Sequence, residues 1–301
     1  MDTFLQQVIN GLTLGSFYAL VALGYTMVYG IIRLINFAHG DLFMVGAFAG
    51  LSLLSSLGGL AGKMSPFVII PLVFIVPMAT VGLMGAVIER LAYRPLRRAP
   101  RLSPLITAIG VSLALEIAVE LLTKAQYQLF PSVLPSTVWS IGNVVISAAQ
   151  VLIVPVTLAL MAALYLFVQR TMLGKAMRAI AIDQDTAQMM GINVDSLISL
   201  TFFVGGALAA AAGVMFGTYY GSINFDMGFL LGLKAFTAAV LGGIGNIPGA
   251  MLGGYLLGLL ETFAAGYISG EWKDVFAFLI LIGVLTLRPT GILGEHVVEK
   301  I

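Results

Sequence analysis

The 301-residue chain has no cysteine and only two histidines, His39 and His296. The missing thiols exclude disulfides and thiolate metal sites, and two histidines are too few for a metal centre or a credible catalytic triad. The phosphate-binding pattern G-x-x-x-x-G-K-[ST] is also missing. Its nearest fragment, Gly174-Lys175-Ala176, has neither the earlier glycine nor the hydroxyl residue that phosphate and Mg²⁺ require. We therefore predict no enzyme activity, no metal site and no cofactor bound by this chain.

Charge is also scarce. Charged residues make up 10 % of the chain, whereas a soluble domain carries about 25 %. The formal net charge of +1 gives no reason to expect a nucleic-acid partner. Hydrophobic residues make up 59 %, mean hydropathy is +1.03, and the 35 glycines suit helices that approach closely in lipid. The composition predicts an all-α polytopic membrane protein with a single transmembrane domain over residues 1–301 and lipid as its surroundings.

Nine apolar runs approach the length of about 20 residues that a helix needs to cross the hydrocarbon. The second and seventh are the least certain, because each follows a polar break and is a candidate broken helix. We predict eight or nine transmembrane segments. The runs cover residues 8–32, 42–60, 66–88, 102–122, 151–168, 197–217, 229–245, 248–266 and 275–287.

The two polar breaks belong to an internal repeat. Residues 35–42 read INFAHGDL and residues 223–230 read INFDMGFL. At this constant offset of 188, seven of the fourteen positions from 35 to 48 are identical. Related halves with a break beside an apolar run are typical of transporters, whose substrate path lies between the repeats. We place the halves at residues 8–122 and 197–287.

Basic residues predict the orientation, because they are enriched in cytoplasmic loops. Clusters after the third and fifth segments, together with Arg288 and Lys300, place both loops and the C-terminus in the cytoplasm. Counting back puts the N-terminus outside. The first segment then runs inward and its partner, the sixth, runs outward, so the two copies are inverted. The clusters are Arg90, Arg94, Arg97, Arg98 and Arg101, and Arg170, Lys175 and Arg178.

Several longer motifs carry a family resemblance over essentially the whole chain. They are LINFAHG at residues 34–40, ERLAYRP at 89–95, the polar loop at 170–193, KAFTAAVLGGIG at 234–245 and PTGILG at 289–294. In this order they resemble the permease family of branched-chain amino acid ABC importers, in particular its LivH-type subunits.

The resemblance implies a bacterial inner-membrane importer for leucine, isoleucine and valine, in which this chain forms half of the translocation path. It implies a second related permease, two cytoplasmic ATPase subunits that bind ATP and Mg²⁺, and an extracytoplasmic amino-acid-binding protein. An ion-coupled secondary carrier is the alternative from another class. A permease for another small solute, such as urea or an amide, is the alternative within the family.

The loop at residues 170–196 is where the family's coupling helix falls, seated on the ATPase. Small and apolar residues at helical spacing predict a short helix, with Gly191 as its stop; an ordinary solvated connector is the alternative. The loop departs from the Glu-Ala-Ala opening of other importer permeases, so contacts there would use basic residues. The residues assigned to this contact are Gly174, Lys175, Arg178, Asp183, Ala187 and Gly191.

Charges within apolar runs are costly and usually paired or functional. Lys234 and Glu261 lie at similar distances on either side of the turn at 246–249, so an antiparallel hairpin brings them to the same depth. We predict that they pair. The alternative places both at the outer interface, with Lys234 extended toward the headgroups.

Polar residues at the two breaks complete the predicted substrate pathway. They either line the path or serve the backbone of the following helices, with Asn36 and Asn224 as caps and Asp41 as a first-turn residue favoured by the helix dipole. We favour capping for the two asparagines. His39 has no ionisable counterpart in the repeat, which makes it a candidate for a role on one side only. The predicted pathway set is Asn36, His39, Asp41, Asn224, Lys234 and Glu261.

Overall fold

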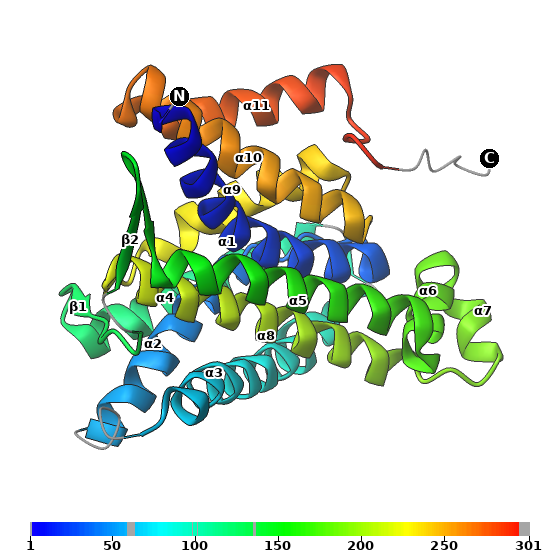
Figure 1. Ribbon diagram of the computed structural model, residues 1–301. Coiled ribbons are helices and arrows are strands. Elements are labelled where there is room, and N and C mark those ends of the chain that lie inside the picture. Colours follow the sequence, from blue (N-terminus) through cyan, green and yellow to red (C-terminus); the bar gives the residue numbers. More distant parts are fainter. Residues whose placement is uncertain (1, 59–63, 98, 101, 135–136, 295–301) are drawn as a thin grey trace.

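The computed structural model describes residues 2–58, 64–97, 99–100, 102–134 and 137–294. Over these ranges the chain is predominantly helical, with two small two-stranded sheets (Figure 1). Arg98, Arg101, His296 and Lys300, and the last two residues of the predicted second segment, lie outside the described residues.

Each predicted apolar segment coincides with a helix over most of its described residues. In the described ranges, seven of these helices are long and apolar enough to cross a membrane, whereas α9 has 16 residues and α11 has 15. The all-α polytopic class is therefore confirmed, and the count of eight or nine full crossings is not. The helices are α1 (Asp2–Ile32), α2 (His39–Leu57), α3 (Pro66–Ile88), α4 (Leu102–Thr123), α5 (Ala148–Arg170), α8 (Val194–Tyr220), α9 (Met227–Gly242), α10 (Ile247–Tyr267) and α11 (Lys273–Leu287).

Shorter elements connect these helices. A π-helical turn, η2 (Glu89–Tyr93), and a 3₁₀ turn, η3 (Arg94–Leu96), follow α3, and η4 (Gly270–Trp272) precedes α11. Helices α6 (Met172–Ile182) and α7 (Gln184–Met189) follow α5. Strands β2 (Val138–Ile141) and β3 (Val144–Ser147) form an antiparallel hairpin, and β1 (Gln128–Leu129) pairs antiparallel with β4 (Ser222–Ile223).

The internal repeat is visible in where helices end and begin. Helices α1 and α8 end at Ile32 and Tyr220, which are equivalent at the offset of 188. Each is followed by a left-handed residue, Arg33 with φ 53° and Gly221 with φ 70°. The next helices, α2 and α9, again begin at equivalent positions, 39 and 227. Both copies therefore share one backbone plan, a long helix, a six-residue break and a second helix.

The two copies run in opposite directions. Phe17 packs against Phe216 and Tyr220 near the end of α8, whereas Gly24 lies beside Gly205, nearer the start of α8. Contacts that move backward along α8 as they move forward along α1 make the two helices antiparallel, which is the relation that an inverted repeat requires.

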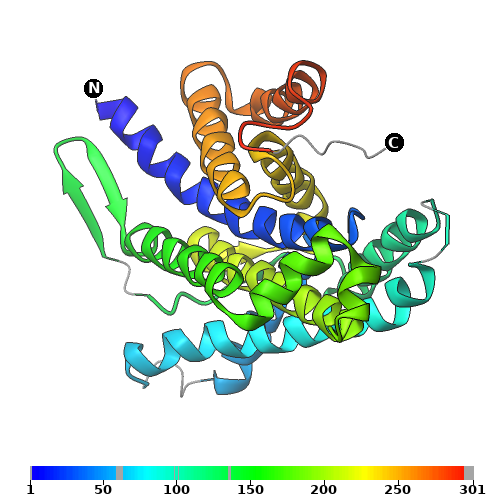
Figure 2. The ribbon, with the colours of Figure 1, turned by 90° about the vertical axis from the view of Figure 1, so that its right-hand side faces the viewer.

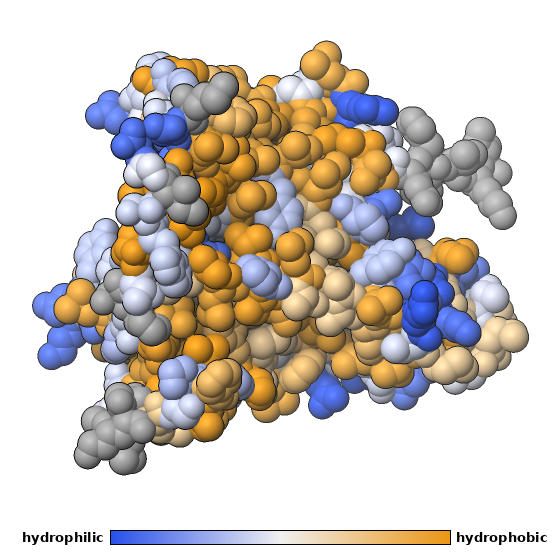
Figure 3. All heavy atoms as spheres, viewed as in Figure 1, coloured by the Kyte–Doolittle hydropathy of each residue, from blue (hydrophilic) through white to orange (hydrophobic). Residues whose placement is uncertain are grey.

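The bundle has two polar ends. We call the end with the start of α1 and the β2–β3 hairpin the hairpin end, and the opposite end the α6–α7 end (left and right in Figure 1). The face of the molecule in Figure 3 is mostly hydrophobic between them, with hydrophilic residues gathered at the ends. Arg94 and Arg97 form ion pairs with Asp195, so the loops after α3 and before α8 share one end, as the predicted topology requires.

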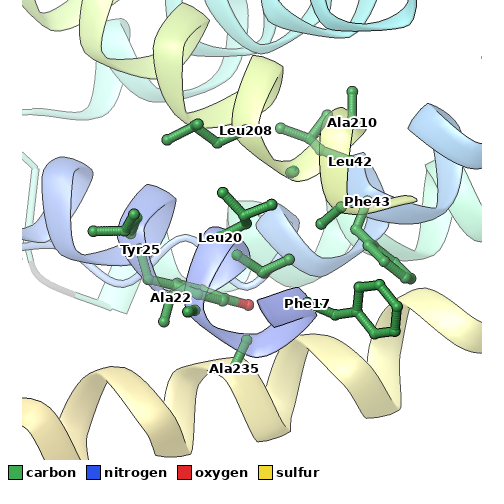
Figure 4. Packing of buried hydrophobic residues seen from close by; sticks show 14 of the residues in the cluster. Phe17, Leu20, Ala22, Tyr25, Leu42, Phe43, Leu208, Ala210 and Ala235 are labelled. Carbon is green, nitrogen blue, oxygen red and sulfur yellow. The ribbon is translucent and has the colours of Figure 1, made fainter. Parts of the chain in front are cut away.

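Helix α1 forms the centre of the core. Phe17, Leu20, Ala22 and Tyr25 are buried and pack against residues of α2, α8 and α9 (Figure 4). By contrast, only 11 % of an 18-residue apolar stretch of α4 is buried inside the protein. Figure 2, viewed from the α6–α7 end, shows α6 and α7 lying across the ends of the central helices. The core thus unites both repeat copies, and α4 stands largely apart.

Glycines allow the central helices to touch through their backbones. A Cβ at Gly254 would collide with Ala19, so α10 and α1 approach with no space for a side chain. Gly206 similarly lies against Val81, and Gly253 against Ala238. These close contacts at glycine pack helices of the same chain against one another, as expected for membrane bundles.

Candidate functional site

A cavity of about 580 Å³ lies at the hairpin end, between α1, α8, α9 and α10. Its volume is in the range of small-molecule sites. Three predicted pathway residues, Asn224, Lys234 and Glu261, line it. The remaining walls combine apolar and polar side chains, among them Leu14, Tyr18, Phe216, Tyr220, Leu230, Leu231, Asp226 and Lys273. The cavity can therefore surround an apolar group and also offer charges of both signs.

The predicted pair of Lys234 and Glu261 is confirmed. The Lys234 ammonium lies 2.7 Å from Glu261 Oε1, and the two side chains are 5 % and 3 % exposed. The alternative that placed both charges at the interface is wrong for these buried groups. The turn at 246–249 explains the pairing, because α9 and α10 run back along each other from it.

Two further residues complete the charge network. Asp274, in the first turn of α11, lies 2.5 Å from the Lys234 ammonium and is 37 % exposed. The Tyr18 hydroxyl donates a 2.6 Å hydrogen bond to Glu261 Oε2. Burying charges is tolerated when the ions are paired and their remaining oxygens accept hydrogen bonds. This network therefore joins α1, α9, α10 and α11 beside the cavity, with Tyr18, Lys234 and Glu261 in its wall.

The second break enters the same cavity. The Asn224 amide donates a hydrogen bond to the Asp226 carboxylate, and both residues line the cavity. The predicted capping role of Asn224 is wrong, because α9 follows Asp226 as its N-cap residue and no side chain caps it. Pairing of Ile223 with Gln128 ties this break to the segment after α4.

The first break does not line this cavity, and its polar side chain Asn36 is buried elsewhere. Asn36 is 3 % exposed and accepts a 2.6 Å hydrogen bond from the Tyr93 hydroxyl. Its predicted capping role is also wrong, because the N-cap residue of α2 is Ala38, again without a side-chain cap. His39 is buried against Gly24 and Gly205, with its ring 4.8 Å from that of Tyr25. The pathway roles of these residues stay predictions.

The helices after the breaks meet at their N-terminal ends. A Cβ on Gly40 would collide with the Gly228 carbonyl and lie 2.8 Å from Gly232 Cα. Gly40 and Gly228 are equivalent in the repeat, so the axis that relates the copies passes between them. Asp41, in the first turn of α2 as predicted, is buried, and its Oδ1 lies 3.0 Å from the position of a Cβ on Gly228. The carboxylate thus faces the positive ends of two helix dipoles.

The predicted coupling helix consists of two helices, α6 and α7, separated at Asp183. Gly174 is buried against the end of α5, and Lys175 is exposed. Arg178 donates to the Val168 carbonyl, which anchors α6 to α5. Ala187 is buried. Lys175 is therefore the better placed of the two basic residues for contact with another subunit.

Asp183 and Gly191 set the limits of α7. The Asp183 carboxylate accepts hydrogen bonds from the Thr186 backbone and hydroxyl and from the Asp185 N–H, and these lower its pKa below the usual value. Gly191 has φ 85°, one residue after the C-cap Met190, which confirms the predicted helix stop. Asp183 therefore stays charged at neutral pH as the N-cap of α7.

Comparison with known proteins decides the class of this chain. The family described as "Branched-chain amino acid transport system / permease component" matches residues 7–285. The chain belongs to this family. The permease is 49 % identical to the high-affinity branched-chain amino acid transport system permease protein BraD of Pseudomonas aeruginosa, over 99 % of this chain and 98 % of BraD.

Two other relatives differ in how much they cover. The permease is 46 % identical to the high-affinity branched-chain amino acid transport system permease protein LivH of Escherichia coli (strain K12), over 99 % of this chain and 98 % of LivH. The autoinducer 2 import system permease protein LsrC of Yersinia enterocolitica is 35 % identical over 42 % of this chain and 37 % of LsrC. The predicted family and membrane class are confirmed, and the permease is a transport subunit rather than an enzyme.

Sequence reasoning missed the partners of the polar residues it found. Asp274 lies one residue before the predicted ninth segment, because an uncharged apolar run can begin only after this carboxylate. The hydrogen bonds of Tyr18 and Tyr93 gave no sequence signal, because they join residues 243 and 57 positions apart. Among the described residues, no group of three or more His, Cys, Asp or Glu side chains could hold a metal ion.

Proposed function

We propose that this permease translocates leucine, isoleucine and valine as one of two related permease subunits in an ATP-driven importer. The observation that carries the proposal is 49 % identity over 99 % of the chain to a branched-chain amino acid permease. ATP and Mg²⁺ would be bound by two separate ATPase subunits, and a binding protein would deliver the amino acid. The combination of apolar and charged walls in the cavity supports a zwitterion with a branched apolar side chain as substrate.

The charge distribution supports an inner-membrane orientation with the α6–α7 end and the C-terminus in the cytoplasm. Basic residues concentrate at that end, as the positive-inside rule predicts for cytoplasmic loops. They include Arg33, Arg90, Arg94, Arg97, Arg170, Lys175, Arg178 and Arg288. The cavity at the hairpin end would then face the binding protein.

Exposed apolar side chains support ATPase docking on α6 and α7. Met172 is 78 % exposed, Ile182 83 % and Met189 79 %, although all three are on a polar end of the bundle. Apolar side chains grouped on an otherwise polar surface mark contact sites for other proteins. Methionine adapts its shape to a partner, which suits a contact that moves.

A single cysteine at Lys175 tests both the orientation and the docking. Because the natural chain lacks cysteine, Lys175→Cys provides the only thiol in this subunit. We expect a membrane-impermeant maleimide to label it only after permeabilisation, and bound ATPase subunits to slow that labelling by covering the site. The matched control, Asn143→Cys in the hairpin, should be labelled in intact cells and unaffected by the ATPase. Reversed labelling of the two sites would disprove the orientation, and labelling at 175 that the ATPase leaves unchanged would disprove the docking.

The function itself is tested by co-purifying the permease with the products of neighbouring genes. We expect a second permease and two ATPases to co-purify, and leucine-loaded binding protein to stimulate ATP hydrolysis in the reconstituted complex. An ion-coupled carrier would instead take up substrate as this chain alone, without ATP. Stimulation by a binding protein loaded with urea or an amide, and not with leucine, would assign the permease to another solute.

A further inference from the structure

A chain of polar contacts leads from the α6–α7 end to the first break. We propose that Arg97, Glu89 and Tyr93 are positioning residues that carry movement of the α6–α7 end to Asn36. This inference rests on the proposed function, because it assumes that an ATPase moves α6 and α7. The contacts join three segments that are distant in sequence, namely residues 31–36, 89–97 and 184–199.

The first link joins the start of α8 to the turn after α3. Arg97 Nη1 lies 2.7 Å from Asp195 Oδ1, and Arg97 Nη2 pairs with Glu89 Oε1. Arg94 also pairs with Asp195. Asp195 is the second residue of α8, and only residues 190–193 separate α8 from α7. Movement of α7 therefore reaches the guanidinium of Arg97 through a short stretch of backbone.

The second link is Glu89, which is fully buried. Besides Arg97, its carboxylate accepts a 2.5 Å hydrogen bond from the Ser199 hydroxyl of α8. A buried carboxylate must keep its charged partner, because leaving it alone in the interior is strongly unfavourable. When Arg97 shifts with Asp195, Glu89 is therefore constrained to follow.

The third link is the π-helical turn that begins at Glu89. The Arg94 N–H bonds to the Glu89 carbonyl, which closes the wider turn. Such turns are rare overall and are frequently found at functional sites. Tyr93, at the other end of this turn, is 1 % exposed and packs 5.4 Å from the Phe202 ring. Its hydroxyl donates a 2.6 Å hydrogen bond to Asn36, so a shift in the position of Glu89 moves the side chain that holds the break.

A groove lies between α7 and the turn after α3, so the polar contacts are needed to transmit movement from one to the other. A groove of about 870 Å³ separates Arg94 and Arg97 from Gln184 and Gln188 of α7. The two sides therefore do not transmit force by close packing at this place. A second contact reaches the last turn of α1, just before the break, where Gln184 Nε2 donates a 3.0 Å hydrogen bond to the Ile31 carbonyl. The first break is thus held from both sides by the α6–α7 end.

Within the part of the chain that the structure describes, no polar side-chain contact connects the second break to the α6–α7 end. Asn224, the repeat partner of Asn36, bonds locally to Asp226. Strand β4 ties this break to Gln128 and Leu129 at the hairpin end. The repeat equivalence thus provides an internal comparison, with one break connected to each end of the molecule.

The test uses Tyr93→Phe, which removes one hydroxyl and keeps the ring in place, in the assembled importer with a reporter cysteine at Phe37. In the parent, we expect the rate of N-ethylmaleimide labelling at 37 to differ between the nucleotide-free and ATP-trapped states. Tyr93→Phe should abolish that difference. Leucine uptake per ATP hydrolysed should fall about tenfold, the upper range for one hydrogen bond. Hydrolysis itself should continue.

Two controls separate transmission from a merely structural role. A reporter at Phe225, at the second break, should keep its nucleotide response in Tyr93→Phe. Tyr165→Phe, which removes a tyrosine hydroxyl on the partly exposed face of α5, should change neither response nor uptake. Glu89→Gln should reproduce the loss at Phe37.

Two outcomes overturn the proposal while the proposed function stands: an unchanged nucleotide response at 37 in Tyr93→Phe, and a parent reporter at 37 that ignores nucleotide while leucine is transported. If leucine-loaded binding protein fails to stimulate ATP hydrolysis even in the parent, the proposed function fails instead. The two failures are thus distinguishable.

Discussion

Lys234→Met should destabilise the permease by about 3–5 kcal/mol, because removing one partner of a buried ion pair leaves the other uncompensated. Glu261 is 3 % exposed and would keep only the Tyr18 hydroxyl. Asp274 would lose the same cation. We expect a large loss of folded protein in detergent, measured by size-exclusion chromatography after a temperature series, and loss of leucine uptake in cells.

The control for this prediction comes from the same cavity. Lys273→Met removes a neighbouring charge that lines the cavity and forms no ion pair within the described ranges, so its stability should change by less than about 1 kcal/mol. Adding Glu261→Gln to Lys234→Met should restore much of the stability, since the stranded charge is removed. If Lys234→Met were as stable as Lys273→Met, the network would not hold these helices together.

The sequence was sufficient for features set by local geometry. The turn at 246–249 fixed the depth of Lys234 and Glu261, so their pairing followed from counting residues. The repeat offset likewise predicted that α2 and α9 are equivalent helices, and their first residues coincide at the offset of 188. Gly191 was recognisable as a helix stop because a left-handed residue there is a local requirement.

Features set by tertiary competition were not predictable in this way. Asparagine before a helix predicts an N-cap, but the Asn36 side chain instead accepts a hydrogen bond from the Tyr93 hydroxyl. The cavity could not be assigned to the second break rather than the first, because both carry the same Asn-Phe sequence. The contacts of Asp274 and Tyr18 with the Lys234–Glu261 pair could be predicted only from how α11 and α1 pack on α9 and α10.

Gly40→Ala should nearly eliminate leucine uptake, because the added methyl group has no space at the contact between the two repeats. It would collide with the Gly228 carbonyl and lie 2.8 Å from Gly232 Cα, and backbone atoms cannot move aside as a flexible side chain can. Overpacking of this kind costs about 1–3 kcal/mol. Uptake of labelled leucine and the thermal stability of purified protein would measure the two effects separately.

Gly110→Ala is the matched control, since Gly110 lies within helix α4 and nothing is within 4 Å of an added Cβ. There, alanine should be neutral or stabilising by up to about 1 kcal/mol through its higher helix propensity. The same substitution thus has opposite signs at two glycines, which separates packing from propensity. Gly228→Ala, at the equivalent position, should resemble Gly40→Ala, because its Cβ would lie 2.9 Å from the Gly40 carbonyl. Normal uptake by Gly40→Ala and Gly228→Ala would show that the helices after the breaks do not meet this closely while the permease works.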